Sequence, residues 1–241
     1  MDPLAYWDRE DVESMYDKHL LGAELALIAP RIPTGSLVLD AGCGEGEGTA
    51  RYREIAGARL HAVDFSPTRL RKAAARLAGA ANVELERLDL TRAPLSRSYD
   101  VIVSQRFLIN LAGWPQQQEV LAKLLSALRP GGRLLLLEGS RQGVERLDAL
   151  RARWGLPPIP IKWHNRFLDD EELRRFLDGR ARLVEEAGLG AYFVLTRCLR
   201  PALEPGELRW DCDFNRRAAE SRSLGISDEF SRLKLWLADK P

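Results

Sequence analysis

The chain has few of the residues on which cross-linked or metal-organised proteins depend. Its 241 residues include three cysteines, Cys43, Cys198 and Cys212, and three histidines. These cysteines are too few and too scattered for a disulfide framework or a zinc site, so we expect no metal. A reducing, cytoplasmic environment suits this composition best. No apolar run approaches the roughly 18 residues of a membrane-spanning helix, and the polar, acidic N-terminus is unlike a signal peptide.

An excess of charge is also missing. The sequence has 36 basic and 35 acidic residues, for a formal net charge of +1. A balanced total does not indicate a nucleic acid or a membrane as partner, and we expect neither. The hydrophobic fraction of 45% is ordinary, and a chain of this length can bury a full core. We therefore expect one domain, and we leave open whether it forms a homodimer.

Short apolar runs alternate with helical patterns through the first 140 residues. The patterns predict strands at 36–40, 59–64, 83–90, 99–105 and 132–139, and helices at 10–30, 46–56, 67–78 and 113–130. This alternation indicates right-handed βαβ units and a parallel sheet covered on both faces. The remainder predicts helices at 144–155 and 169–178, a loop at 157–166, a strand within 181–187 and a last strand at 233–240. We expect residues 188–230 to form an insertion over the sheet.

The stretch "VLDAGCGEGEG", Val38 to Gly48, places alternate glycines directly behind the first predicted strand. A dinucleotide-binding turn needs G-x-G-x-x-G, but the third glycine position falls on Glu47. Asp40 ends the strand, and a carboxylate there repels a pyrophosphate but suits a ligand that carries an ammonium group. The pattern therefore disfavours an NAD-dependent oxidoreductase.

The motif D-x-G-x-G-x-G resembles the first motif of the class I S-adenosylmethionine (SAM) methyltransferases. Asp64 ends the second predicted strand, 24 positions after Asp40. The segments "RLDL", "YDVIVSQ" and "LRPGGRLLLLE" are similar to later segments of that family, in the order the family requires, and the resemblance covers residues 36–139. It implies SAM as cofactor and a Rossmann-like, doubly wound α/β fold. The sheet would have seven mostly parallel strands, with the last strand antiparallel.

The resemblance also implies a set of cofactor-binding residues. Asp64 would accept hydrogen bonds from the ribose hydroxyls, Asp89 would reach the adenine amino group, and the backbone of Leu90 would contact the ring. For Asp64 and Asp89 a role as helix cap is the alternative. We expect Cys43 to be a small packed side chain rather than a reactive thiol. The full implied set is Asp40, Gly42, Cys43, Gly44, Gly46, Asp64, Phe65, Asp89, Leu90 and Ser104.

Two further segments resemble small-molecule and sugar O-methyltransferases of bacteria: "SQRFLINL" at 104–111 and "WHNRF" at 163–167. Arg106 and Asn110 are four positions apart and share a face on a helical turn. The guanidinium suits a carboxylate or phosphate, and an ordinary surface ion pair is the alternative. His164 is the best candidate for a general base because its ordinary pKa lies near neutrality, and a purely structural role is the alternative. Asn165 suits either substrate binding or a helix cap.

The resemblance divides the single domain into three parts: a helical lid at 1–34, a SAM-binding core at 35–140, and an acceptor-side and C-terminal part at 141–241. In the lid, the aromatic candidates for contact with the methionine portion of SAM are Tyr6, Trp7 and Tyr16. Lys18 and His19 stand where relatives carry an arginine. Amphipathic packing of this segment on the domain is the alternative.

The expected function is a methyltransferase that acts on a hydroxyl or carboxylate oxygen of a small molecule, such as a sugar or a natural-product intermediate. An RNA or protein methyltransferase would share every SAM residue, and a non-catalytic SAM-binding module would need no acceptor pocket. The segment 192–220 mixes aromatic residues with arginines, as single-stranded nucleic acid binders do. Acidic residues within it, such as Asp211 and Asp213, argue against a groove that follows phosphates.

Overall fold

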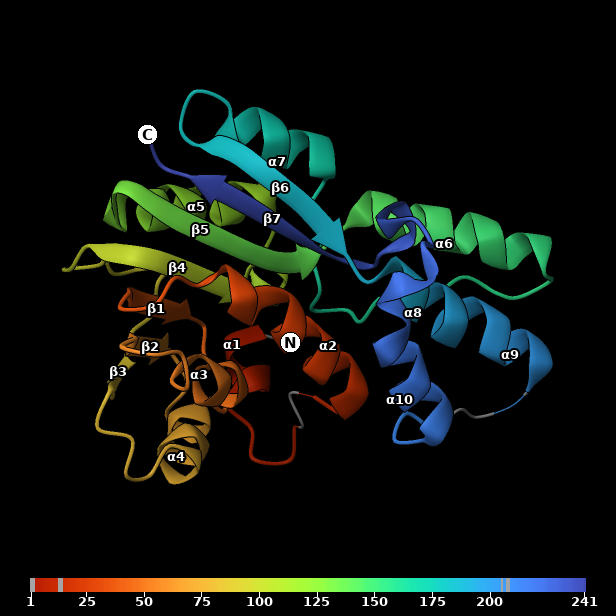
Figure 1. The fold of residues 1–241 in the computed structure, drawn as a ribbon, viewed down its shortest axis with the longest axis horizontal. Coiled ribbons are helices and arrows are strands. Elements are labelled where there is room, and N and C mark those ends of the chain that lie inside the picture. Colours follow the sequence, from red (N-terminus) through yellow and green to blue (C-terminus); the bar gives the residue numbers. More distant parts are fainter. Residues whose placement is uncertain (1–2, 13–14, 205, 207–208) are drawn as a thin grey trace.

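A computed structural model describes residues 3–12, 15–204, 206 and 209–241 of the chain. Its centre is a seven-stranded sheet with the order β3-β2-β1-β4-β5-β7-β6 (Figure 1). Strands β1 to β5 are parallel where they pair, and β7 is antiparallel to both β5 and β6. This confirms the predicted fold class. The strands are β1 (Leu37–Ala41), β2 (Arg59–Asp64), β3 (Val83–Arg87), β4 (Tyr99–Gln105), β5 (Leu128–Gly139), β6 (Arg182–Gly188) and β7 (Leu233–Asp239).

Helices begin where the sequence supplies a side-chain cap. Asp17, Ser66, Ser140 and Asp169 each accept a hydrogen bond from a backbone N–H in the first turn of α2, α4, α6 and α7. The helices of the first 180 residues are α1 (Pro3–Trp7), α2 (Lys18–Ile28), α3 (Glu47–Tyr52), α4 (Pro67–Arg76), α5 (Trp114–Ala127), α6 (Arg141–Arg153) and α7 (Asp170–Leu177). In the described ranges, no helix is long and apolar enough to cross a bilayer.

The core consists of two apolar clusters, one on each face of the sheet. The first packs α2 and α8 (Gly190–Val194) against residues such as Val103 and Leu235. The second packs α5 and α7 against residues such as Ile102 and Trp236. Neighbouring residues of β4, Val103 and Ile102, thus belong to opposite clusters, as the alternation of side chains along a strand requires. Burial on both faces explains the nearly continuous apolar runs of β4 and β5.

The strand order reverses between β1 and β4. From β1 the sheet runs outward through β2 to β3 on one side and through β4 to β5 on the other. In sheets of this type ligands bind beyond the carboxyl ends of the strands at such a reversal. The glycine stretch follows β1 and Arg106 follows β4, so the fold brings the two candidate segments to the same place.

Two predicted helices differ most from the structure, and the helix predicted at 46–56 is shortened to α3, Glu47–Tyr52. The helix predicted at 10–30 is confined to α2, because Asp17 caps its first turn; α1 is a separate short helix, and residues 13 and 14 lie outside the described residues. The helix predicted at 113–130 ends at Ala127, because Leu128 already pairs with Tyr99 of β4. The strand predicted at 132–139 accordingly begins earlier, at Leu128.

Residues 189–232 form the predicted insertion, and Figure 1 shows its helices gathered beyond the ends of β6 and β7. A π-helical segment, Leu195–Leu199, continues α8 and leads into α9 (Arg200–Leu203); α10 (Asp213–Glu220) follows. Pro201 has no N–H to offer the carbonyl of Arg197. The guanidinium of Arg151 donates to that carbonyl instead, which ties the irregular helix to α6.

Candidate functional site

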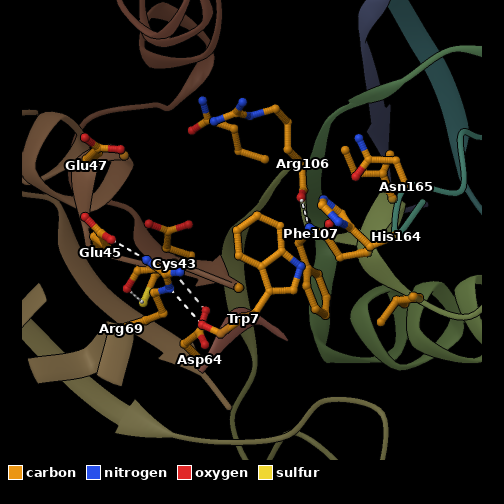
Figure 2. Close-up of a pocket in the computed structure, with 18 of the residues that line it drawn as sticks. Trp7, Cys43, Glu45, Glu47, Asp64, Arg69, Arg106, Phe107, His164 and Asn165 are labelled. Atoms are coloured by element: carbon orange, nitrogen blue, oxygen red, sulfur yellow. Dashed lines mark hydrogen bonds and ion pairs between the residues drawn. The ribbon is translucent and has the colours of Figure 1, made fainter. Parts of the chain in front are cut away.

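A cavity of about 240 Å³ opens at the reversal of strand order. The loops after β1, β2, β3 and β4 form its floor, and residues of the N-terminal segment, the 162–167 loop and the insertion complete its walls. In Figure 2 the acidic side of the cavity, with Asp64 and Glu45, faces Arg106 and His164 across the indole of Trp7. The cavity is therefore two-sided.

The glycine turn presents bare backbone to the cavity. Gly42 has a φ of +72°, and a Cβ there would lie 2.6 Å from the ring of Phe107, so no larger residue fits. The N–H groups of Gly42 and Cys43 both donate to the carbonyl of Val63 at 2.9 Å. The end of β2 therefore fixes the turn, and the cavity face of the turn stays free for a ligand.

Two buried carboxylates flank this turn. Thr49 donates its hydroxyl hydrogen to Asp40 at 2.5 Å, and burial raises the pKa of Asp40 to about 6 against the effect of that bond. Asp64 accepts the backbone N–H groups of Gly44 and Ser66, each at 2.9 Å. Burial raises the pKa of Asp64 as well, and the two backbone hydrogen bonds oppose the rise. Carboxylates in this setting gain from a cationic or hydroxyl-bearing ligand.

The cavity continues past β2 and β3 to Phe65, Asp89 and Leu90. Asp89 accepts the backbone N–H and the hydroxyl hydrogen of Thr91 at 2.9 and 2.6 Å, which forms a local turn. Asp89 can thus hold this local turn and line the cavity at the same time. Phe65 and Leu90 supply an apolar surface against which a flat ring can pack.

Three of the predicted cofactor residues have settings that differ from one another. Cys43 lines the cavity, and burial raises the pKa of its thiol well above the ordinary value, as expected of a packed side chain. Gly46 does not line the cavity: it precedes α3 with a φ of +75°, and a Cβ there would lie 3.1 Å from Ala73. Ser104 does not line it either, because its buried hydroxyl donates to Glu138 at 2.7 Å. Gly46 and Ser104 thus support the site from behind.

On the other side, Arg106 is the one non-glycine residue in the described part of the chain with a positive φ, at 52°. Strain of this kind is typical of functional loops that the surrounding structure holds in place. The Nε of Arg106 lies 3.4 Å from the buried carboxylate of Glu24, and the amide of Asn110 donates to the carbonyl of Arg106 at 2.7 Å. Burial raises the pKa of Glu24, and Arg106 and Gln105 oppose the rise. Arg106 and Asn110 share one turn, as the spacing predicts, and both line the cavity.

Glu138 of β5 holds this strained loop. Its carboxylate accepts the backbone N–H groups of Phe107, Leu108 and Ile109 at 3.1, 3.0 and 3.3 Å. Burial raises the pKa of Glu138 to about 7, and these hydrogen bonds oppose the rise. No sequence pattern indicates this role, because a single acid at the end of an apolar run resembles an ordinary strand terminus.

His164 lies under the N-terminal lid. It is 3% exposed, and its ring centroid is 4.7 Å from that of Tyr6 and 5.1 Å from that of Trp7. Burial lowers the pKa of His164, and the charges of Lys162 and Arg166 lower it further, so the imidazole is neutral at neutral pH. Its Nδ1 is buried and has no hydrogen-bond partner among the described residues. His164 lines the cavity, and a neutral imidazole with an unpartnered ring nitrogen is able to accept a proton.

The other predicted residues divide between the cavity and its surroundings. Trp7, Tyr16 and Asn165 line the cavity, whereas Tyr6 does not line it and packs against Trp7 and His164. Lys18 and His19 do not line it. Lys18 pairs with Glu47 at 3.0 Å, and His19 lies 3.4 Å from Asp211.

The cavity residues that the sequence does not predict include two arginines: Arg197 in the π-helical segment and Arg232 directly before β7. Both belong to the region between the last two strands, where the sequence pattern assigns no element. Within the described ranges, no group of three or more His, Cys, Asp or Glu side chains is arranged to hold a metal.

The residues at the reversal fit SAM. The acidic side offers Asp40 to an ammonium group, Asp64 to vicinal hydroxyls and Leu90 to a ring. In addition, several buried polar atoms of the cavity residues make no hydrogen bond within the described part of the chain and are able to bond a ligand; they belong to Trp7, Arg69, Asn110 and His164. The donors and acceptors of the cavity therefore suit a ligand with both charged and hydroxyl groups.

Comparisons with known proteins agree with this fit. A model of the family described as "Methyltransferase domain" matches residues 38–132. The chain is 37% identical over 129 residues to a malonyl-[acyl-carrier protein] O-methyltransferase of Herminiimonas arsenicoxydans, covering 52% of this chain and 46% of that protein. It is 32% identical over 161 residues to a demethylmenaquinone methyltransferase of Thermobifida fusca, covering 65% and 66%. The chain thus spans between about half and two thirds of the length of these relatives.

A solved structure shares the fold over the whole chain. The N-methyltransferase NodS of Bradyrhizobium japonicum, crystallised with S-adenosylhomocysteine (SAH), has a TM-score of 0.61 at 15% identity, with 100% of both chains covered. Its SAH lends further weight to SAM as the cofactor of this fold. The match at residues 38–132, the seven-stranded sheet and the fit of the cavity together show the fold of the class I methyltransferases, with SAM as its cofactor.

Proposed function

We propose that this protein transfers the methyl group of SAM to a hydroxyl or carboxylate oxygen of a small molecule. The observation that carries the proposal is the two-sided cavity, which has acids and bare backbone for a cationic cofactor on one side and His164, Arg106 and Asn110 on the other. A module that only binds SAM has no use for the second side. The names of the relatives include an O- and an N-methyltransferase, so the acceptor atom is argued from the cavity.

Bound SAM supplies a methyl group activated by a sulfonium. An acceptor oxygen attacks the methyl carbon and the carbon–sulfur bond breaks. The electron pair of that bond stays on the sulfur, which becomes the uncharged thioether of SAH. A hydroxyl acceptor must also give up its proton, and His164 Nδ1 is the buried, neutral and unpartnered group that takes it. A carboxylate acceptor needs no base and only requires positioning.

The chain's own contribution is mainly alignment and exclusion of water. Asp8 accepts the hydroxyl hydrogen of Ser66 at 2.6 Å and the N–H of Thr68 at 3.2 Å, which anchors the N-terminal segment to the start of α4. Trp7 then lies across the cavity, and Arg69 donates to its carbonyl at 2.9 Å. The lid in this position covers a small acceptor and leaves little room for a folded RNA.

The proposal is tested with SAM that carries an isotopically labelled methyl group. The enzyme is incubated with a bacterial metabolite extract, and separately with total RNA and total protein. We expect a labelled product in the small-molecule fraction, with the mass increase of one methyl group, and alkaline hydrolysis distinguishes a methyl ester from a methyl ether. Label confined to RNA or protein, or no binding of SAM by calorimetry, would overturn the proposal.

A further inference from the structure

Among the described residues, three cationic side chains line the cavity outside the segments that follow β1, β2, β3 and β4. Arg197 comes from the π-helical segment and Arg232 from the residue before β7, and both line the cavity with Lys162 of the facing loop. None of them belongs to the predicted cofactor or catalytic set. A role for these cations rests on the proposed function, because it concerns the acceptor of that same site.

The basic side chains of the cavity differ in whether an acidic partner neutralises them. Arg197 donates to the buried carboxylate of Asp17 at 3.2 Å and stacks over Trp210 at 3.9 Å. Arg106 has Glu24 as its ion-pair partner, and Lys162 is exposed to solvent beside Tyr16. The guanidinium of Arg232 is partly buried and makes no hydrogen bond or ion pair with any described residue. Burial and, to a smaller extent, the nearby charge of Arg197 together lower the pKa of Arg232 to about 10.

Arg232 is held in a fixed place. Its carbonyl accepts the N–H of Ser140 at 2.9 Å, and its guanidinium lies 5.2 Å from the ring centroid of Phe167, which also lines the cavity. Phe167 in turn packs on Gly139, where a Cβ would lie 2.6 Å from the ring. An aromatic ring against one face leaves the N–H edge of a guanidinium free, and that edge matches a carboxylate in a bidentate geometry.

Arg232 is too far across the sheet to serve the cofactor. It precedes β7, and β4 and β5 lie between β7 and β1. Three strand spacings of roughly 4.8 Å give a lateral separation of about 14 Å. The glycine turn and Asp64 follow β1 and β2, so the cofactor lies over that half of the sheet. Arg232 therefore faces the acceptor's half of the cavity.

We propose that Arg232 anchors a carboxylate group of the methyl acceptor. One unpaired guanidinium balances one negative charge, which favours a carboxylate over a doubly charged phosphate. A carboxylate engaged by a guanidinium is a weakened nucleophile, so this group holds the acceptor while a separate hydroxyl reaches His164. The acceptor is thus a small hydroxy-carboxylate, and Arg232 is a specificity-determining residue.

Benzoate, its neutral isostere benzamide, and inorganic phosphate serve as probes. Each is titrated calorimetrically into the protein with and without saturating SAH. For a compact anion of this size we expect benzoate to bind with a Kd on the order of a millimolar. Benzamide should bind at least tenfold more weakly, and phosphate should bind more weakly than benzoate.

Variants assign the effect to the residue. Arg232→Gln should weaken benzoate binding at least tenfold and leave the Kd of SAH unchanged, and Arg232→Lys should recover part of the loss. Arg182→Gln removes an arginine whose side chain is 77% exposed and outside the cavity, and it should behave as the wild type. Circular dichroism and thermal melting show whether each variant is folded.

Separate outcomes refute the two proposals. If the wild type does not bind SAH, the proposed function fails whatever benzoate does. If SAH binds normally but benzoate and benzamide bind alike, or phosphate binds more tightly than benzoate, the carboxylate anchor is wrong. If Arg232→Gln weakens SAH instead of benzoate, the guanidinium serves the cofactor, and the inference is again overturned.

Discussion

At the scale of single residues, the cofactor side of the cavity depends on acids that the fold keeps out of water. A buried carboxylate with a raised pKa is an unfavourable element of the free protein unless a ligand compensates it. Asp40 and Asp64 are both of this kind, and they lie on either side of the glycine turn. The binding of SAM would relieve this desolvation, so we expect large effects from small changes here.

Replacement of Asp64 by alanine should weaken SAH binding. Its carboxylate already accepts two backbone N–H groups, and its remaining lone pairs are those that face the cavity. The loss of hydrogen bonds to a charged acceptor corresponds to roughly 100-fold in affinity. Isothermal calorimetry measures the change. Asp213→Ala, at an exposed position of α10, is the matched control, and equal affinities for both variants would contradict the assignment to the ribose.

Replacement of His164 by alanine should lower kcat for a hydroxyl acceptor by about 100-fold or more, with little change in the KM for SAM. Because burial lowers the pKa of His164, the base remains neutral, and the rate stays high, to a pH below the ordinary histidine range. His19→Ala alters a histidine outside the cavity and serves as control. An unchanged kcat in His164→Ala would assign the reaction to a carboxylate acceptor or to another base.

At the scale of elements, the short loop after β4 is the least regular part of the site and the most tightly held. The positive φ of Arg106 is tolerated because Glu138, from the neighbouring strand β5, accepts the three backbone N–H groups that follow. This arrangement links the position of Arg106 and Asn110 to the protonation of one buried carboxyl group.

That link predicts a pH dependence of stability. Burial raises the pKa of Glu138 to about 7 in the folded protein, whereas an unfolded glutamate titrates near about 4.3. Between these values the folded state binds more protons, so this group's contribution to the free energy of unfolding is full below about pH 4.3 and is lost as the pH rises to about 7. Urea unfolding should show that the advantage of the wild type over Glu138→Gln shrinks from about pH 5 to about pH 8.

Wild type and Glu138→Gln share all the other buried acids. The contributions of those acids therefore cancel in the difference between the two free energies of unfolding. Glu119→Gln, at an exposed position of α5, should show no such trend. Parallel curves for wild type and Glu138→Gln across this range would mean that the carboxyl does not titrate there.

The sequence predicts the sheet and the cofactor side well, because both depend on local patterns. The strands at 59–64 and 99–105 match β2 and β4 residue for residue, and the spacing of Asp40, Gly42 and Asp64 places all three at the cavity. Ser104 and Gly46 stand outside the cavity lining, because position along the chain does not tell which way a residue faces. Arg232 and Glu138 were missed because their roles arise from contacts between distant strands.

At the scale of the whole molecule, one sheet carries the two halves of the site side by side. The residues proposed to bind the cofactor follow β1, β2 and β3, and those proposed to bind the acceptor follow β4 and β5 or precede β7. The lid spans both halves, since Trp7 is bonded to Arg69 of α4 and packs on His164 of the 162–167 loop. A ligand that binds in either half of the cavity therefore stabilises the same folded unit.

This coupling predicts a global stabilisation by ligand. SAH at 100 times its Kd should stabilise the folded state by about 2.7 kcal/mol, which raises the Tm of a chain of this size by roughly 5–10 °C. Differential scanning calorimetry measures the shift. Asp64→Ala at the same SAH concentration should show a much smaller one. The absence of any shift in the wild type would mean that SAH does not bind the native fold.

The insertion leaves the sheet at Gly188 and returns at Leu233, and Gly188 pairs with Lys234. The chain thus makes its excursion between two points that the sheet already holds together. The entropy of such a loop grows only slowly with its length. Insertions and deletions in residues 189–232 can therefore reshape the proposed acceptor side, while the strands that carry the proposed cofactor residues stay in place.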